Sequence, residues 1–303
     1  MPELPEVHTT VVELERLIVG KTLLNVWSGY DSPHYYGKEQ VKDPAYFKKF
    51  KAQILGSTII GTSRIGKNVL IHLDIGSTIL VHMKMTGHLL FGNYSYNKKE
   101  KKWNAVGKGP LKDDKWNGFI RMVFSFTDST RLALSDLRKF AKVQLIKTDE
   151  LHNHPELLDL GPDPLSETFT LSTFKERMRS RASGKIKQVL MDQNLIAGVG
   201  NIYSDEALWL AEIHPTTIVK KLNDAQLKKL FRAVQEILKK GIDFKGDSTS
   251  DYRTPSGTPG EFHHKHQVYR RTGEPCTREG CTGTIERLVI GGRSAHFCNT
   301  CQK

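Results

Sequence analysis

All four cysteines of the chain fall within its last 28 residues, at Cys276, Cys281, Cys298 and Cys301. The two close pairs, C-x4-C and C-x2-C, are separated by sixteen residues that read as a strand, a Gly-Gly turn and a strand. This spacing suits a tetrahedral site of four thiolates around one zinc ion. Such a zinc is structural, because four protein ligands leave no open position for a substrate. Two disulfides or idle thiols are the alternative.

The chain has 303 residues, enough for two domains, and carries a formal net charge of +12. A basic protein favours a polyanionic partner, because binding releases counterions from a phosphate backbone. A merely soluble basic surface is the alternative. We expect no membrane span, since there is no apolar run of about 18 residues, and no signal peptide at the N-terminus. The expected location is therefore the cytoplasm or nucleoid.

The first half of the chain reads as a leading helix followed by strands. Val7, Val11, Leu14 and Ile18 recur at helical spacing, and Gly20 suits the end of that helix. Residues 93–117 are rich in lysine and predict a solvated flexible loop. The predicted strands are Leu23–Trp27, Ile54–Arg64, Val69–Leu73, Thr78–Met83, Phe119–Phe126, Arg131–Leu134 and Lys142–Ile146.

The second half reads as helical. Residues 148–165 resemble a linker, and residues 244–262 are rich in Gly, Ser, Thr, Asp and Pro, which predicts a mobile loop. The predicted helices are Leu171–Arg181, Ile186–Asp192, Ser204–Ala211 and Ala225–Lys240.

Three motifs occur in order along the chain: Pro-Glu-Leu-Pro-Glu-Val from Pro2, Asp-Gln-Asn-Leu-Ile-Ala-Gly-Val-Gly-Asn-Ile-Tyr from Asp192, and Gly-Arg-Ser-Ala-His-Phe-Cys from Gly292. With them the chain resembles the formamidopyrimidine-DNA glycosylase family, whose relatives include endonuclease VIII. The resemblance covers nearly the whole chain. It implies an α+β fold: an N-terminal β-sandwich with a leading catalytic helix (1–147), a linker (148–165), a helical domain with a helix–two-turn–helix and a lesion-capping loop at 244–262 (166–262), and a zinc-finger β-hairpin (263–303).

The resemblance also implies a bifunctional DNA glycosylase and AP lyase of base excision repair. Such an enzyme acts as a monomer on damaged double-stranded DNA, excises 8-oxoguanine and formamidopyrimidines, and cleaves the strand by β,δ-elimination. It needs one structural zinc ion and no nucleotide or redox cofactor. Leu4 and the long 244–262 loop favour this branch of the family. An endonuclease VIII-like enzyme for oxidised pyrimidines and a lyase-dead protein that binds DNA damage are the alternatives.

The N-terminus carries the expected chemistry. If Met1 is removed, Pro2 has a free secondary amine, and an α-amino group with a pKa near ~8 is a better nucleophile at neutral pH than a lysine near ~10.4. The resemblance implies that Pro2 forms the Schiff base, that Glu3 is the acid/base group, and that Glu6 supports both. Otherwise Pro2 merely starts a helix, and the acidic residues favour its N-terminus.

Three further residues match positions that grip the DNA near the lesion. The resemblance implies that Lys67, on a tight turn, reaches the lesion and its phosphate and takes part in the chemistry. Asn201 and Arg293 match residues that hold the flanking phosphates, and Arg293 also assists elimination. The plainer alternatives are an exposed turn lysine, a capping asparagine and a surface arginine.

Extruding a base leaves a hole in the duplex that side chains must fill. By resemblance Met85 intercalates, Arg138 pairs with the orphaned base, and Phe140 wedges beside it. Core packing is the alternative for Met85. Arg181 and Lys187, just before the second motif, are expected to add phosphate contacts, with ordinary surface residues as the alternative.

Overall fold

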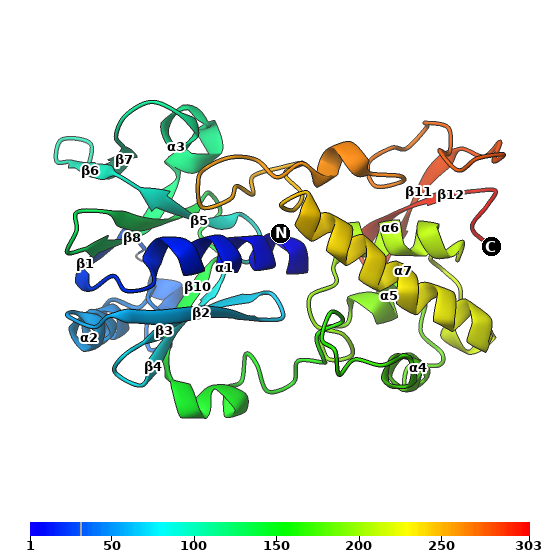
Figure 1. Ribbon diagram of the computed structural model, residues 1–303, viewed down its shortest axis with the longest axis horizontal. Coiled ribbons are helices and arrows are strands. Elements are labelled where there is room, and N and C mark those ends of the chain that lie inside the picture. Colours follow the sequence, from blue (N-terminus) through cyan, green and yellow to red (C-terminus); the bar gives the residue numbers. More distant parts are fainter. Residues whose placement is uncertain (31) are drawn as a thin grey trace. The chain divides into compact units, whose positions relative to one another are not determined.

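The computed structural model describes residues 1–30 and 32–303. Contacts divide the chain into two compact units (Figure 1): Met1–Leu158 with Lys245–Glu261, and Asp159–Phe244 with Phe262–Lys303. The sequence interpretation assigned residues 244–262 to the helical domain, whereas the contacts assign Lys245–Glu261 to the first unit. The reason is that the hydrogen bonds of this segment go to residues such as Glu6 and Phe91 of the first unit.

Two four-stranded antiparallel sheets build the first unit, with strand orders β1-β8-β9-β5 and β10-β4-β3-β2. Apolar side chains of both sheets share one core with helix α1 (Leu4–Ile18), as Val7, Val81 and Phe124 illustrate. The predicted β-sandwich with a leading helix is therefore confirmed. The strands are β1 (Leu23–Ser28), β2 (Ile59–Ile65), β3 (Asn68–Leu73), β4 (Ser77–His82), β5 (Gly87–Gly92), β8 (Ile120–Phe126), β9 (Arg131–Asp136) and β10 (Lys142–Lys147).

The leading helix follows its sequence pattern. Val7, Val11, Leu14 and Ile18 are all buried and form the stripe that packs on the sheets. Just beyond the helix, Gly20 takes a φ of 82°, a left-handed conformation that favours glycine. The N-terminal residues are thereby fixed on a rigid element.

One predicted strand, Ile54–Arg64, begins too early. Residues up to Ile54 form helix α2 (Pro44–Ile54), whose N-terminus is capped by the Asp43 carboxylate accepting from the Tyr46 N–H at 2.7 Å. Strand β2 starts only at Ile59. Strand β5 was not predicted, since its few apolar residues stand between two glycines.

The prediction of a solvated flexible loop over residues 93–117 is wrong. The region forms a hairpin of β6 (Tyr94–Asn97) and β7 (Lys102–Ala105), then helix α3 (Pro110–Asp113) and a 3-10 turn at Lys115–Gly118. Its apolar side chains cover the outer face of the first sheet; the Trp27 and Trp103 rings lie 6.3 Å apart, and Tyr94 is 2% exposed. The lysines at the hairpin tip stay exposed. Aromatic residues between the lysines are thus the signal that the charge pattern obscured.

The second unit contains the four helices that the sequence predicted for the second half of the chain: α4 (Leu171–Arg179), α5 (Ile186–Met191), α6 (Asn201–Ala211) and α7 (Asp224–Asp243). Helix α7 begins with a reciprocal capping box, in which Asn223 and Gln226 each accept the other's backbone N–H at 2.9 and 3.0 Å. Further 3-10 turns lie in the first unit at Pro33–Tyr35 and Thr148–Asn153, and in the second unit at Val219–Lys221 and Phe262–Lys265.

A β-hairpin completes the second unit. Strands β11 (Ile285–Ile290) and β12 (Arg293–Cys298) pair antiparallel, with Ile290 opposite Arg293. Gly291 and Gly292 between them have φ angles of 55° and 75°, as a two-residue hairpin turn of this twist requires. The predicted strand, Gly-Gly turn and strand are confirmed, and with them the α+β fold class.

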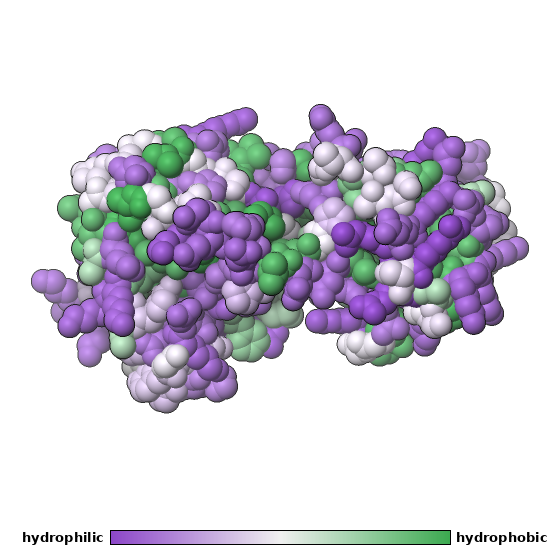
Figure 2. Space-filling view, turned by 90° about the horizontal axis from the view of Figure 1, so that it is seen from below, coloured by the Kyte–Doolittle hydropathy of each residue, from purple (hydrophilic) through white to green (hydrophobic). Residues whose placement is uncertain are grey.

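Hydrophilic side chains cover most of the face seen in Figure 2, and hydrophobic residues gather there only in small separate patches. Within the described residues, no helix is both long enough and apolar enough to cross a membrane.

Candidate functional site

The four cysteines converge at the base of the hairpin, with their Sγ atoms all within 4.8 Å of one another. The Cys276–Cys301 and Cys281–Cys298 sulfur pairs are 3.9 and 3.6 Å apart. Both distances far exceed the ~2 Å of a disulfide. They match the edge of a tetrahedron with Zn–S bonds of about 2.3 Å, which is about 3.8 Å. The cysteines therefore form the site of one structural zinc ion, and the disulfide alternative is excluded.

A polar cleft of about 410 Å³ lies beside this hairpin within the second unit. It brings together two predicted residues: Asn201, the first residue of α6, and Arg293, the first residue of β12. Its other lining residues are Tyr269, Arg270, Arg287, Gly292, Ser294 and His296.

The chemistry of this cleft favours an anion. Three of its lining residues are arginines, no lining residue is a carboxylate among those described, and the N-terminus of α6 opens on it. Arg287 is held by two hydrogen bonds to the Ser294 hydroxyl oxygen, at 2.9 and 2.7 Å. The sequence interpretation missed Arg270 and Arg287; the Arg270-Arg271 pair just before the first cysteine was the available signal.

Lys187 does not occupy the surface position that the sequence interpretation expected. It is 1% exposed, forms an ion pair with Asp205 of α6, and donates to the Ser294 carbonyl at 2.9 Å. Asp205, also fully buried, accepts the His296 backbone N–H at 2.9 Å with its other oxygen. Lys187 and Asp205 therefore fasten the hairpin strand next to Arg293 onto the helices, and we do not assign Lys187 a phosphate.

Arg181 lies outside the cleft. Its side chain is 60% exposed, and its Nε is 3.9 Å from an oxygen of Asp192. It lines a separate, open cavity of about 550 Å³ together with Gln188.

In the first unit, the chain start is packed tightly. Pro2 is buried, Glu3 is 3% exposed and Glu6 is 2% exposed, whereas Met1 is 42% exposed. The Glu6 carboxylate accepts the Glu3 N–H at 2.7 Å with one oxygen and the Asp247 N–H at 2.6 Å with the other. Glu6 thus fixes the backbone at Glu3 and joins it to a segment that is remote in sequence.

Lys67 occupies the predicted tight turn, between β2 and β3. Ile65 pairs with Asn68, so Gly66 and Lys67 form a two-residue turn, and Gly66 has a φ of 57°. Lys67 is only 6% exposed, which rules out a freely solvated turn lysine. Burial, together with the positive charges of Lys84 and Lys67, lowers the pKa of His82 to about 3, so this imidazole is neutral near pH 7.

The three predicted void-filling residues lie on two loops that are tied together. Met85 is half-buried rather than in the core, and Phe140 is 44% exposed with the Arg138 guanidinium 4.5 Å from its ring centroid. Thr86, next to Met85, accepts the Arg138 N–H at 3.0 Å and donates to Asp136 at 2.6 Å. The fully buried Asp136 also accepts the backbone N–H of Ala141, so its carboxylate holds both loops in place. The sequence interpretation missed this brace.

Three family models match the chain. The formamidopyrimidine-DNA glycosylase N-terminal domain matches residues 1–143, the formamidopyrimidine-DNA glycosylase H2TH domain matches residues 160–253, and the zinc finger found in FPG and IleRS matches residues 273–303. Together with the four-thiolate site, these matches define a zinc-containing DNA glycosylase.

Relatives that align over the whole chain identify the family within this class of enzymes. The formamidopyrimidine-DNA glycosylases of Halalkalibacterium halodurans and Bacillus subtilis are 36% and 35% identical, covering 100% of this chain and 100% and 99% of theirs. Crystal structures of Lactococcus lactis Fpg superpose along nearly the full length of both chains at 32% identity. A mutant with Fapy-dG-containing DNA has a TM-score of 0.83 and covers 100% of each chain, and a complex with abasic-site DNA has 0.82 and covers 99% of each. The chain belongs to the formamidopyrimidine-DNA glycosylase family of base excision repair enzymes.

Proposed function

We propose that this protein is a bifunctional DNA glycosylase and AP lyase that removes 8-oxoguanine and formamidopyrimidines from double-stranded DNA. The observation that carries the proposal is the chain start, where Pro2 and Glu3 are buried at the head of a rigid helix and Glu6 accepts the backbone N–H of Glu3. The solved relatives bound to Fapy-dG and to abasic DNA support the choice of substrate.

In the proposed reaction, removal of the exposed Met1 frees the Pro2 amine. Its nitrogen attacks C1′ of the damaged nucleotide, a C–N bond forms, the glycosidic bond breaks, and the base leaves with a proton. Glu3 donates the proton that opens the sugar ring, which leaves an iminium between Pro2 and C1′. The iminium acidifies C2′, whose proton is lost as the 3′ phosphate leaves. In the second elimination the C4′ proton is lost as the 5′ phosphate leaves. Water then releases Pro2.

The remaining proposed roles concern how the protein binds and positions the DNA around the lesion. Asn201 and Arg293 bind the phosphates beside the lesion, and the zinc ion holds the hairpin whose turn presents Arg293. Lys67, preset on its turn, is the proton donor toward the lesion and its phosphate. Arg181 adds a phosphate contact further along the strand.

Met85, Arg138 and Phe140 fill the hole left by the extruded base. Their two loops are braced by Asp136, which suits insertion into a base stack because a loose wedge would have to be ordered on binding. We also propose that the protein acts as a monomer on the nucleoid in the cytoplasm.

Borohydride trapping tests this proposal. Wild-type protein, Pro2→Gly and the matched control Pro5→Ala are incubated with 8-oxoguanine:C or thymine glycol:A duplexes and reduced. We expect a covalent protein–DNA adduct with wild type and Pro5→Ala on the 8-oxoguanine duplex, and little with Pro2→Gly. Preference for thymine glycol would favour the endonuclease VIII-like alternative. Absence of any adduct with wild type would favour a lyase-dead binder.

A further inference from the structure

The zinc site is joined to helix α6 by the loop between the first two cysteines. This loop contains four residues, whereas the loop of the second pair contains two, so the first has more chain with which to reach its surroundings. One of the four, Arg278, contacts the last turn of α6. Trp209, in that same turn, packs against the apolar cluster that contains Cys276 and Cys298.

Trp209 supplies a hydrogen bond to one of the zinc ligands. Its indole Nε1–H donates to the Sγ of Cys276 at 3.4 Å. Backbone N–H groups of neighbouring residues donate to the sulfur atoms of Cys281 and Cys298 at 3.4 Å. A hydrogen bond to a thiolate stabilises its negative charge and fixes its orientation toward the metal. A side chain of α6, outside the zinc hairpin, therefore helps to orient the Cys276 sulfur.

Arg278 in turn holds the Trp209 side chain. Its guanidinium carbon lies 4.6 Å from the centroid of the Trp209 ring, a favourable distance for a cation above an aromatic face. The same guanidinium donates to the Trp209 carbonyl at 2.5 Å and to the Glu212 carboxylate at 2.8 Å. The loop that begins at Cys276 thus returns to the residue whose indole donates to the Cys276 sulfur.

Glu212 completes this arrangement at the end of α6. It is the C-cap of the helix, with a φ of 60°, and its N–H donates to the Trp209 carbonyl at 3.1 Å. Its second carboxylate oxygen pairs with the Lys229 ammonium of α7 at 2.9 Å. The Arg278 guanidinium is favourably placed here, because the last carbonyl groups of a helix carry partial negative charge. The first cysteine loop is therefore fastened to α6 and, through Glu212, to α7.

We propose that Trp209 and Arg278 are positioning residues of the zinc site, which fix the Cys276 sulfur and thereby raise the affinity for zinc. The same helix begins at Asn201, which lines the anion-binding cleft, whereas the hairpin carries Arg293 on the other side of that cleft. Zinc thus stabilises the cleft through α6 as well as through the hairpin. The inference goes beyond the proposed function, since it concerns how the metal is retained and not which base is removed.

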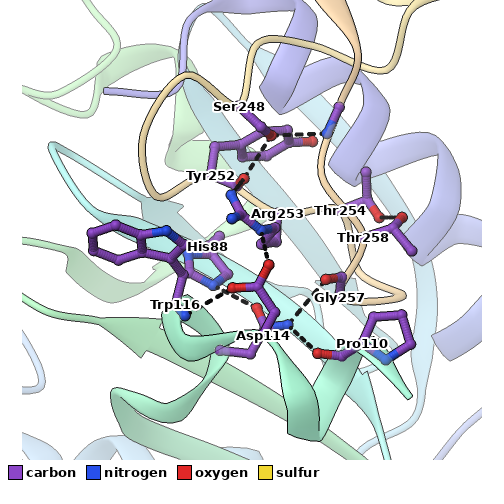
Figure 3. A network of polar contacts seen from close by, with 12 residues as sticks. His88, Pro110, Asp114, Trp116, Ser248, Tyr252, Arg253, Thr254, Gly257 and Thr258 are labelled. Atoms are coloured by element: carbon purple, nitrogen blue, oxygen red, sulfur yellow. Dashed lines mark hydrogen bonds and ion pairs between the residues drawn. The ribbon is translucent and has the colours of Figure 1, made fainter.

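The test measures the zinc affinity of the full chain by competition with a chelator. Trp209→Phe removes the indole N–H but keeps an aromatic ring, and Arg278→Met removes the guanidinium. Trp116→Phe is the control for the first change; Trp116 belongs to the first unit, where its backbone N–H donates to Asp114 at 2.9 Å (Figure 3). Arg179→Met is the control for the second, because Arg179 pairs with an aspartate at the surface of the second unit.

Replacing zinc with cobalt(II) gives a readout that depends on the sulfur atoms themselves. The cobalt-loaded chain absorbs light by charge transfer from thiolate to metal. Removing a hydrogen bond from one thiolate raises the electron density on its sulfur and moves this band to longer wavelength. A general loosening of the packing would weaken metal binding without this shift. Thermal melting at saturating zinc reports whether each variant folds.

We expect Trp209→Phe and Arg278→Met to weaken zinc binding by roughly tenfold or more, and both controls to stay within about twofold of wild type. The cobalt band should move in Trp209→Phe and stay in place in Trp116→Phe. Arg278→Lys should lose less affinity than Arg278→Met, because it keeps a positive charge beside Glu212, and these two variants carry the test if Trp209→Phe does not fold.

Three results would overturn the proposal. The first is an unchanged zinc affinity in Trp209→Phe and Arg278→Met. The second is weaker binding in Trp209→Phe with an unmoved cobalt band, which would indicate a packing role only. The third is a wild-type chain that binds no zinc. None of these results depends on whether the protein excises a base, so they are distinguishable from a failure of the proposed function.

Discussion

Each unit of the protein has a buried carboxylate that holds together the elements around its site, but the two carboxylates are stabilised differently. Asp205 in the second unit pairs with the Lys187 ammonium and accepts the His296 N–H from the zinc hairpin. Glu6 in the first unit accepts two backbone N–H groups, from Glu3 and Asp247.

The contrast shows two ways to hold a DNA-processing site. In the second unit, a charge pair and four metal ligands fix the position of one arginine. In the first unit, hydrogen bonds between segments distant in the sequence fix the start of a helix. The second unit should therefore respond most strongly to loss of metal or charge, and the first to disturbance of its packing and protonation.

Loss of zinc should have the largest effect. Cys301→Ser or strong chelation should unfold the hairpin, because structural zinc supplies about 10–16 kcal/mol of apparent binding free energy in zinc-finger peptides at pH 7. DNA binding should then be lost while the first unit keeps its structure. Metal content, DNA affinity and regional hydrogen exchange measure this. Equally fast exchange in both units would show that the zinc ion does not stabilise the second unit specifically.

Asp205→Ala should destabilise the second unit by about 3–5 kcal/mol, because it leaves a buried ammonium without its partner. Urea unfolding measures the change. Asp224→Ala, which removes a carboxylate paired at the surface with Lys175 and Arg179, is the control and should have little effect. Equal losses in the two variants would mean that burial of the Lys187–Asp205 pair is unimportant.

Acid should lower the stability of the first unit through His88. This side chain is 1% exposed, and its Nε2 lies 3.1 Å from the Oδ1 of Asn117. Burial lowers the pKa of His88 to about 4, below its ordinary value of 6.5. The folded state therefore prefers the neutral form. The contribution of the neutral His88 to the free energy of unfolding is fully present above pH 6.5. It is lost as the pH falls from 6.5 toward 4, by up to about 3 kcal/mol. His88→Gln should flatten this part of the stability profile; an unchanged profile would contradict the assignment.

Glu6→Gln should lower the free energy of unfolding by about 1–3 kcal/mol. This is less than for Asp205→Ala, because the amide oxygen of the new side chain still accepts a hydrogen bond. The Asp247 amide should exchange faster, as mass spectrometry or NMR can show. Glu236→Gln, an exposed glutamate on α7, is the control. Unchanged exchange at Asp247 would show that Glu6 does not hold the segment.

Arg270→Gly should have the smallest effect. It should raise the stability of the protein slightly and weaken its binding to DNA. Arg270 has a φ of 60°, so glycine relieves strain of about 1 kcal/mol. Yet the cleft loses a guanidinium, so the slope of log K against log salt should fall by about 1 if Arg270 contacts a phosphate. Lys101→Gly, with a φ of 50° at an exposed hairpin tip, should relieve similar strain with little effect on that slope. A DNA affinity unchanged in Arg270→Gly would remove it from the cleft's function.

The same contrast explains what could be predicted from the sequence. The cysteine set, the Gly-Gly turn and the Val7–Ile18 stripe are each specified within a few tens of residues, and all were predicted. The bond from Asp247 to Glu6 joins residues 241 positions apart, and no local pattern reports it. Lys187 was misassigned because its burial depends on Asp205, although its apolar neighbours Ile186, Val189 and Leu190 were a signal.

The proposed reaction depends on Pro2 as the nucleophile, and peptide mass spectrometry of the borohydride-trapped adduct can show which residue holds the sugar. We expect the reduced sugar remnant on an N-terminal peptide that begins at Pro2 and lacks Met1. A remnant on the peptide containing Lys67, or on a peptide that still carries Met1, would contradict it.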